Sequence, residues 1–231
     1  MTHRPRQFVL DLGHRPAFGA ADLMVSSSNE EAVAWIDQWP DWPGVGVVIH
    51  GPEGCGKSHL ARVFQAKSGA ALIAASALDL ERAAALAALG AVVIEDGAGL
   101  VDERALFHLF NALAQAGSSL LITDRSPPAR WRLDLPDLKS RLAALPAVPV
   151  RPPDDELLAA VLVKQFADRQ IRVGVAVIDF LIARMDRSFA AARRLAEELD
   201  RLSLAERRSI TVPLARDVLG RLQNQAGSPP V

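Results

Sequence analysis

The amino-acid sequence predicts an α/β fold, a parallel sheet with helices on both faces, followed by a small all-helical C-terminal domain. Three observations predict it. A glycine-rich loop at residues 51–58 follows a short apolar run and opens a helical stretch. Apolar runs then alternate with helical patterns as far as residue 150, the order typical of a parallel sheet. Beyond Pro152 and Pro153 every periodic segment is helical.

The elements follow one another in a regular order. The apolar runs that we expect to form strands cover residues 45–49, 70–74, 91–96, 120–124 and 148–150. The patterns that we expect to form helices cover residues 58–64, 78–89, 102–116, 138–142, 154–170, 175–185, 189–202 and 213–225. Asp154 and Asp155 are good helix-start residues. We therefore place the α/β domain at residues 17–151 and the helical domain at residues 152–225.

Composition and charge indicate a globular chain of a reducing compartment. The 231 residues are 50% hydrophobic, enough for two cores, and the net charge of −1 draws the chain to neither nucleic acid nor membrane. Cys55 is the only cysteine, so the chain forms no internal disulfide. It has neither a membrane-spanning apolar run nor a signal-peptide core. We expect a cytoplasmic protein with no membrane contact and a disordered tail at residues 226–231.

The glycine-rich loop carries the clearest chemistry. It reads Gly51-Pro52-Glu53-Gly54-Cys55-Gly56-Lys57-Ser58, a complete G-x-x-x-x-G-K-[ST] pattern. Glycines let backbone N–H groups turn around phosphate oxygens, and the helix that follows favours an anion at its start. We expect Lys57 at the β- and γ-phosphates and Ser58 on Mg²⁺. His59 is expected to be packed or capped rather than a metal ligand. A chance match in a glycine-rich turn is the alternative, and the flanking strand and helix count against it.

Two acids, Glu95 and Asp96, end the third apolar run. In nucleotide-hydrolysing folds a strand-end acid often holds Mg²⁺, and a following acid polarises the attacking water. The usual order is aspartate first, and the longer Glu95 would crowd an octahedral Mg²⁺ site. If Asp96 is the metal acid, Gly97 stands where the catalytic acid belongs. Either alignment predicts weak hydrolysis, and an exposed acid pair without a metal role is the alternative.

Polar and cationic residues elsewhere are further candidates. Thr123 and Asp124 end the next apolar run, where a polar side chain would sense the γ-phosphate; a turn role for Asp124 is the equal alternative. Arg141 lies on a short helix from which an arginine finger can reach a neighbouring subunit. Arg193 and Arg194 begin a helix face that can fold over the phosphates. For each arginine, a solvated or ion-paired surface position is the alternative.

The N-terminal segment, residues 1–16, is predicted to be a flexible peptide. It contains Gln7, Leu10 and Leu12 in a stretch rich in Pro, Gly and His. Apolar side chains on such a segment either pack back on the domain or dock into another protein.

These motifs together resemble a known family, the AAA+ ATPases of the DnaA replication-initiator group, and within it the short Hda-type members that inactivate the initiator in bacteria. The resemblance covers about residues 7–222. Residues 25–32 look like the adenine-side box of this family, and the glycine-rich loop looks like its Walker A motif. Glu95 and Asp96 look like Walker B, and Thr123 and Asp124 look like sensor 1. Residues 135–142 look like the box that carries the arginine finger.

The resemblance implies roles for these residues. Arg141 becomes the arginine finger acting in trans, and Arg193, with Arg194 as the neighbouring choice, becomes sensor 2. Gln7, Leu10 and Leu12 match the peptide that docks on the sliding clamp, the beta subunit of DNA polymerase III. The implied cofactors are ADP or ATP with Mg²⁺, held by Ser58, Glu95 and Asp96. The cofactor-binding residues are then Gly51, Pro52, Gly54, Cys55, Gly56, Lys57, Ser58, His59 and Arg193.

The leading hypothesis is therefore a negative regulator of replication initiation. It would dock on the DNA-loaded clamp and stimulate ATP hydrolysis by DnaA, contacting DNA only through the clamp, at the nucleoid or replisome. The sequence leaves both a monomer and a homodimer as alternatives. The order of Glu95 and Asp96 departs from the family, and no helix-turn-helix domain follows the helical domain, so direct sequence-specific DNA binding is not expected. The alternative is an autonomous AAA+ ATPase of the helicase-loader or transposase-helper type.

Overall fold

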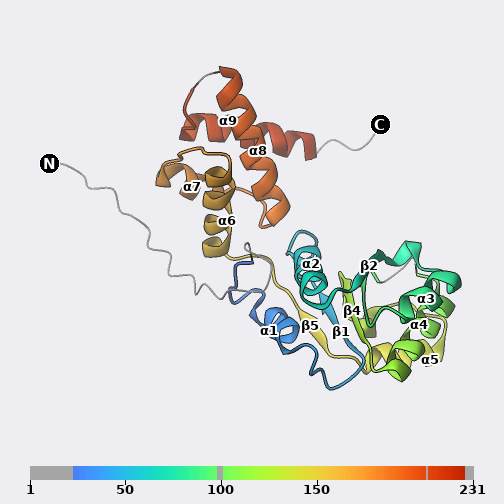
Figure 1. The fold of residues 1–231 in the computed structure, drawn as a ribbon. Helices are drawn as coiled ribbons and strands as arrows, with labels where there is room; N and C mark the ends of the chain where they lie inside the picture. The colour runs from blue at the N-terminus through green and yellow to red at the C-terminus, as the bar shows by residue number, and fades with distance from the viewer. Residues whose placement is uncertain (1–22, 98–100, 207, 227–231) are drawn as a thin grey trace.

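The fold was analysed in a computed structural model that describes residues 23–97, 101–206 and 208–226. The N-terminal peptide with Gln7, Leu10 and Leu12, and the tail beyond residue 226, lie outside the described residues. Two bodies are visible, a sheet domain below and a helical domain above it (Figure 1). No helix in the described part of the chain combines the length and apolar character needed to cross a membrane.

The first body is built on one parallel five-stranded sheet, which confirms the predicted fold class. Its spatial order is β2-β3-β4-β1-β5. The strands are β1 (Gly46–His50), β2 (Ala71–Ala74), β3 (Ala91–Glu95), β4 (Ser119–Asp124) and β5 (Ala147–Pro149). Because β1 lies between β4 and the edge strand β5, the loop that follows it emerges one strand in from the edge of the sheet.

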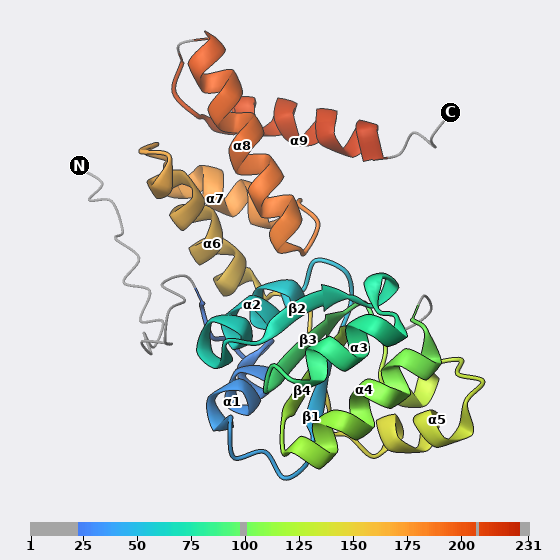
Figure 2. The same ribbon diagram turned by 45° about the vertical axis from the view of Figure 1, so that its right-hand side comes forward.

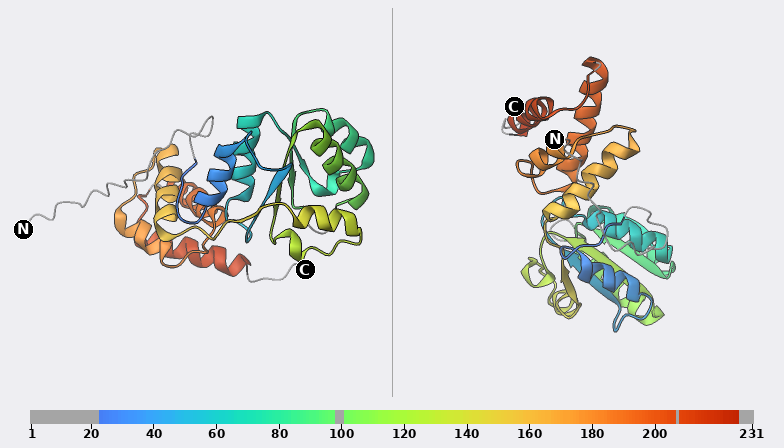
Figure 3. Two further views of the ribbon diagram at one scale, coloured as in Figure 1. Left: turned by 90° about the horizontal axis from the view of Figure 1, so that it is seen from below. Right: turned by 90° about the vertical axis from the view of Figure 1, so that its left-hand side faces the viewer.

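Helices cover both faces of this sheet, as Figure 2 and the left view of Figure 3 show. One face carries α1 (Glu30–Gln38) and α2 (Lys57–Ser68), and the other carries α3 (Leu80–Ala87), α4 (Glu103–Ala116) and α5 (Pro136–Ala143). The strands alternate between the two cores: Val47 and Ile49 pack toward the α1–α2 side, and Val48 toward the α4–α5 side. Buried runs of this kind are the mark of a sheet covered on both faces.

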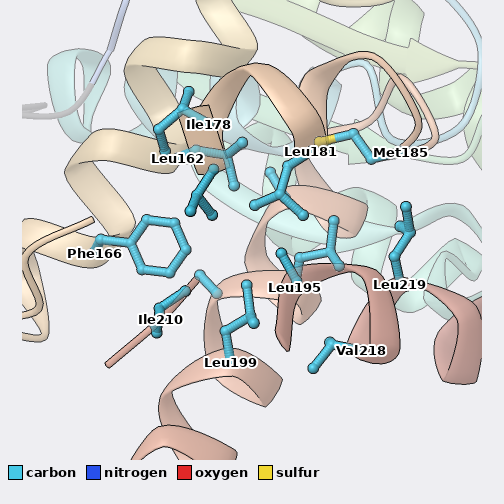
Figure 4. Close-up of a cluster of buried hydrophobic side chains, with 14 of the residues drawn as sticks. Leu162, Phe166, Ile178, Leu181, Met185, Leu195, Leu199, Ile210, Val218 and Leu219 are labelled. Carbon is cyan, nitrogen blue, oxygen red and sulfur yellow. The ribbon is translucent and has the colours of Figure 1, made fainter. Parts of the chain in front are cut away.

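The second body is a helical domain with its own core. It contains α6 (Asp155–Asp168), α7 (Val175–Ile182), α8 (Phe189–Glu206) and α9 (Val212–Ala226). Leu162, Phe166, Leu181 and Leu199, each at most 2% exposed, lie at the centre of this core (Figure 4). Asp154 begins α6 by accepting a hydrogen bond from the Leu157 amide at 2.8 Å, the cap expected of a helix-start aspartate.

The structure moves several predicted boundaries. The third strand ends at Glu95, because Asp96 has a positive φ of 56° that a strand does not accommodate. The helix expected from residue 78 begins at Leu80, because Asp79 caps it by accepting a hydrogen bond from the Arg82 amide at 2.8 Å. Residue 226 belongs to α9 rather than to the tail.

Candidate functional site

The glycine-rich loop and the helical domain enclose a cavity of about 550 Å³. It lies at the C-terminal end of β1, the side of a parallel sheet where ligands bind in folds of this class. Residues from the loop, the strand ends, the segment before α1, α6 and α8 all contribute to its wall. The wall is formed by Leu23, Met24, Asn29, Glu53, Gly54, Cys55, Gly56, Lys57, Ser58, His59, Leu60, Asp96, Thr123, Arg125, Leu157, Val161, Lys164, Gln165, Asp168, Phe189, Ala190 and Arg193.

The loop has the geometry of an anion cradle. Lys57, 9% exposed, donates from Nζ to the carbonyl oxygens of Gly51 and Pro52, both at 2.8 Å. Gly56 precedes α2 with a φ of 104°, a conformation that glycine adopts readily. The start of α2 therefore points into the cavity with Lys57 and Ser58 beside it, and a helix start attracts anions.

The helical domain touches the loop directly. The Phe189 amide donates to the carbonyl oxygen of Gly54 at 3.1 Å. A Cβ on Gly54 would lie 2.5 Å from Cβ of Ser188, and one on Gly56 would lie 2.9 Å from the Phe189 ring. Both glycines are thus needed for the close approach of the start of α8, in addition to their positive φ.

The segment before α1 forms a further part of the cavity wall. Leu23 and Met24 contribute apolar surface there. The Asn29 side chain, 6% exposed, holds this segment: Oδ1 accepts from the Ser26 amide at 2.9 Å and Nδ2 donates to the Met24 carbonyl at 2.9 Å. This segment falls within and beside the predicted adenine-side box.

The two acids are divided by the end of β3. Asp96 is exposed and lines the cavity, whereas Glu95 does not. Oε1 of Glu95 is buried and makes no hydrogen bond to any described residue. Gly97 cannot be replaced without strain, because a Cβ there would lie 2.5 Å from Cγ2 of Ile122 and 3.2 Å from the Trp131 ring. No side chain fits at the position after Asp96.

Thr123 and Asp124 separate in the same way. Thr123 lines the cavity. Asp124 is 5% exposed, and its Oδ1 accepts from the Ser126 amide at 2.9 Å, the turn role considered for it. The neighbouring Arg125 forms an exposed ion pair with Glu53 of the loop at 2.9 Å, and both line the cavity.

The structure distinguishes the two sensor 2 candidates by position. Arg193 lines the nucleotide-sized cavity. Arg194 lines a second cavity of about 300 Å³, formed by α8, α9 and the segment that follows α7. The geometry therefore favours Arg193 for any contact with a ligand at the loop.

Arg141 lies outside the cavity. It is exposed on α5, and its Cζ lies 5.4 Å from the centroid of the Phe107 ring and 5.9 Å from that of Phe110, both on α4. Cation–π contacts of this kind hold an arginine in place without neutralising it. In Figure 1, α5 lies at the far side of the sheet domain from α2 and the helical domain.

Burial affects two titratable groups of this region. Burial raises the pKa of the Cys55 thiol, with a smaller opposing effect of Lys57, so the side chain stays a neutral thiol. Burial also lowers the pKa of His50, at the end of β1, and nearby Arg130 acts in the same direction. Cys55 is thus a small, buried side chain that fills space within the loop.

The phosphate end of the cavity fits a Mg²⁺ ion that a nucleotide helps to hold. Ser58 and Asp96 share the cavity, whereas Glu95 does not line it. Among the residues that the structure describes, no three His, Cys, Asp or Glu side chains gather in a group that could hold a metal. Mg²⁺ is commonly bound by one or two carboxylates together with phosphate oxygens and water.

Sequence reasoning missed the part of the cavity wall that the helical domain contributes. These residues, which line the cavity, are Val161, Lys164, Gln165 and Asp168 of α6 and Phe189 of α8. For the four α6 residues the sequence showed only a helical spacing. Such a spacing places residues on one face of a helix but does not indicate what that face contacts.

Comparisons with known proteins agree with this geometry. Residues 154–219 match the family described as Hda, lid domain. Domain III of the Thermotoga maritima replication initiation protein DnaA is similar in structure, with 17% identity, a TM-score of 0.74, and 90% of this chain and 97% of that chain covered. AMPPCP-bound DnaA from Aquifex aeolicus matches at 17% identity and a TM-score of 0.64, with 84% and 70% covered. A DNA replication initiation factor matches at 16% identity and a TM-score of 0.68, with 91% and 68% covered.

Proposed function

We propose that this chain, whose residues 154–219 match the Hda lid domain and whose fold is similar to that of DnaA domain III, is an Hda-type, nucleotide-binding regulator of replication initiation that stimulates ATP hydrolysis by DnaA. The observation that carries this proposal is the separation of Arg141 from the cavity of its own chain. An exposed arginine that does not line the cavity of its own chain is free to contact a nucleotide held by another subunit.

The position of Arg141 suits a finger supplied in trans. The residue is exposed, and its guanidinium rests on the Phe107 and Phe110 rings. A planar guanidinium binds phosphoryl oxygens through several donors, and a finger supplied in trans raises the rate of hydrolysis by roughly 10³–10⁵. The partner whose nucleotide it would reach is DnaA bound to ATP.

The chain's own cavity would hold ADP or ATP as a conformational ligand. Lys57, Ser58 and the backbone of the loop would bind the phosphates with Mg²⁺, and Arg193 would approach from the helical domain, the lid. When bound, Mg²⁺ would neutralise phosphate charge. Of the two strand-end acids, Asp96 is the one that lines the cavity, and the space next to Gly97, the residue after it, is filled by Ile122 and Trp131. We therefore expect weak hydrolysis by this chain alone.

The proposed clamp interaction rests on the resemblance of the N-terminal peptide to the clamp-docking peptide of Hda-type proteins. Gln7, Leu10 and Leu12 would dock as an extended segment into a groove of the DNA polymerase III sliding clamp. Docking would bring Arg141 to DnaA on DNA without direct DNA contact, in the cytoplasm at the nucleoid. A homodimer is compatible with this scheme.

One experiment tests the finger. DnaA–ATP hydrolysis is measured with clamp loaded on DNA, with and without this protein. We expect Arg141→Ala to keep clamp and ADP binding but lose stimulation by at least about 10³-fold. The matched control is Arg62→Ala, an exposed arginine of α2, which should stimulate like the wild type. Full stimulation by Arg141→Ala would exclude the finger role.

A second experiment tests the clamp. Gln7→Ala combined with Leu10→Ala should abolish retention of the protein on immobilised clamp while leaving ADP binding intact. Unchanged retention would remove the docking step from the scheme.

An autonomous ATPase is the second candidate, and one observation favours it: Asp96 and Thr123 line the same cavity as Lys57. It predicts steady ATP turnover by the purified chain, lost in Lys57→Ala. Absence of turnover in the wild type would leave the regulatory proposal in place.

A further inference from the structure

Glu103, the first residue of α4, joins the start of α4 to the start of α5. Its carboxylate accepts two hydrogen bonds from the backbone that leads into α5. Oε1 accepts from the Asp134 amide at 2.9 Å, and Oε2 accepts from the Leu135 amide at 2.7 Å. Leu135 is the N-cap residue of α5, and a leucine side chain has no acceptor with which to cap a helix. A side chain from α4 therefore supplies the acceptor that this helix start needs.

The charge of Glu103 suits both helix starts. Amide groups point outward at the N-terminal end of a helix, so a negative charge is favourable there. Glu103 lies in the first turn of α4 and, through its hydrogen bonds, at the N-terminal end of α5. Hydrogen bonds to an ionised acceptor are roughly twice as strong as those between neutral groups. The carboxylate therefore ties the two helices together at their N-terminal ends.

The same face of α4 carries the rings on which Arg141 rests. Glu103, Phe107 and Phe110 follow one another at spacings of four and three residues, so they lie on one helical face. At a rise of about 1.5 Å per residue, the stretch from Glu103 to Phe110 is about 10 Å long. The stretch from Leu135 to Arg141 is about 9 Å long. Because the two lengths are nearly equal, one face of α4 holds α5 both at its start and at Arg141.

The clamp at the start of α5 matters because this helix is short. It spans Pro136–Ala143, and its buried side chains are Leu138 and Leu142, which pack on the α4 side of the sheet. Two such contacts fix which face of the helix is buried, but they leave it free to tilt about the line that joins them. An anchor at the start of the helix removes that freedom. Glu103 thereby helps to set where the Arg141 guanidinium lies.

We propose that Glu103 is a positioning residue for Arg141, whose guanidinium it holds in the direction needed at the nucleotide of the partner. A group that acts on a reacting phosphate must be placed closely, and a displacement of about 1 Å can lower a rate about 10²-fold. The inference rests on the proposed finger role of Arg141. It gives Glu103, which does not line the cavity of its own chain, a role in hydrolysis that is exerted through Arg141.

The test measures DnaA–ATP hydrolysis, with clamp loaded on DNA, over a range of concentrations of this protein, so that the maximal rate and the half-saturating concentration are separated. Glu103→Gln keeps one acceptor and loses the charge, and should lower the maximal rate about tenfold; Glu103→Ala loses both acceptors and should lower it about 10²-fold. The half-saturating concentration, clamp retention and the dissociation constant for ADP should stay at their wild-type values. Hydrogen exchange at the amides of residues 134 and 135 should become faster in both variants.

Asp102→Ala is the matched control. Asp102 is the neighbouring acid, and its Oδ1 accepts from the amides of Arg104 at 2.9 Å and Ala105 at 3.1 Å, both within its own helix. Loss of this cap should lower the midpoint of urea unfolding, as Glu103→Ala should, but leave the maximal rate unchanged.

Three results would overturn the inference while the finger role of Arg141 stands. The first is a wild-type maximal rate in Glu103→Ala. The second is an equal fall in Asp102→Ala, which would make the effect one of stability. The third is a raised half-saturating concentration with an unchanged maximal rate, which would place Glu103 in partner binding. A wild-type chain that does not stimulate DnaA would overturn the proposed function as well.

Discussion

Gly54→Ala should loosen the contact between the phosphate-binding loop and the lid. Gly54 has a φ of +75°, a region that alanine enters at a cost of about 1–2 kcal/mol. The added Cβ would lie 2.5 Å from Cβ of Ser188, so either the loop or the start of α8 must shift. Overpacking of this kind costs about 1–3 kcal/mol. The two effects together predict that Gly54→Ala lowers the free energy of unfolding by about 2–5 kcal/mol.

Gly69→Ala separates the two effects. Gly69 has nearly the same φ, +70°, but a Cβ there would meet nothing within 4 Å. Gly69→Ala should therefore lower the free energy of unfolding only by the backbone cost, about 1–2 kcal/mol. The difference between the two variants measures the steric contact with the lid.

The assay is urea unfolding followed by circular dichroism, together with the dissociation constant for ADP. A shift of α8 would move Phe189 and Arg193, which line the cavity. We therefore expect Gly54→Ala, and not Gly69→Ala, to weaken ADP binding. Equal stability losses in the two variants and an unchanged ADP affinity would refute the reasoning.

Two further predictions concern the lid core and the loop thiol. Phe166 is 2% exposed in the lid core, so Phe166→Ala should lower the free energy of unfolding by about 3–5 kcal/mol. Phe180 is half-buried, so Phe180→Ala should lower it clearly less. Equal losses of the two variants in urea unfolding would contradict the assigned core. Burial raises the pKa of Cys55, so at pH 8 iodoacetamide should alkylate this thiol more slowly than it alkylates a free cysteine peptide. The alkylation rate should still increase with pH above the pH range in which an ordinary thiol ionises. Added ADP should lower the rate. Alkylation at the rate of the peptide would show that the thiol is accessible and ionised.

The fold class could be predicted because its signals are local. The spacing of residues 51–58 and the alternation of apolar runs with helical faces depend on neighbours in the chain, and they predicted the parallel sheet and the helical domain. Element ends were less accurate. The strand containing Ile94 stops one residue early, because Asp96 adopts a positive φ that its sequence neighbours do not announce.

The candidate site was predicted only in part. Motif spacing found Lys57, Ser58, Asp96 and Thr123, which the structure brings to one cavity. It could not choose between Arg193 and Arg194, because consecutive residues on a helix point about 100° apart and the phase of α8 is set by packing.

By itself the sequence determined the phosphate-binding loop, the order of strands and helices, and the position of Arg141 on a short helix, since each depends on residues close together in the chain. Only the tertiary structure decided which side chains face one another. Glu53 meets Arg125, Gly54 meets Phe189, and Arg141 rests on Phe107, away from its own cavity. Such contacts join segments far apart in sequence, and the packing of the sheet domain against the lid brings them together.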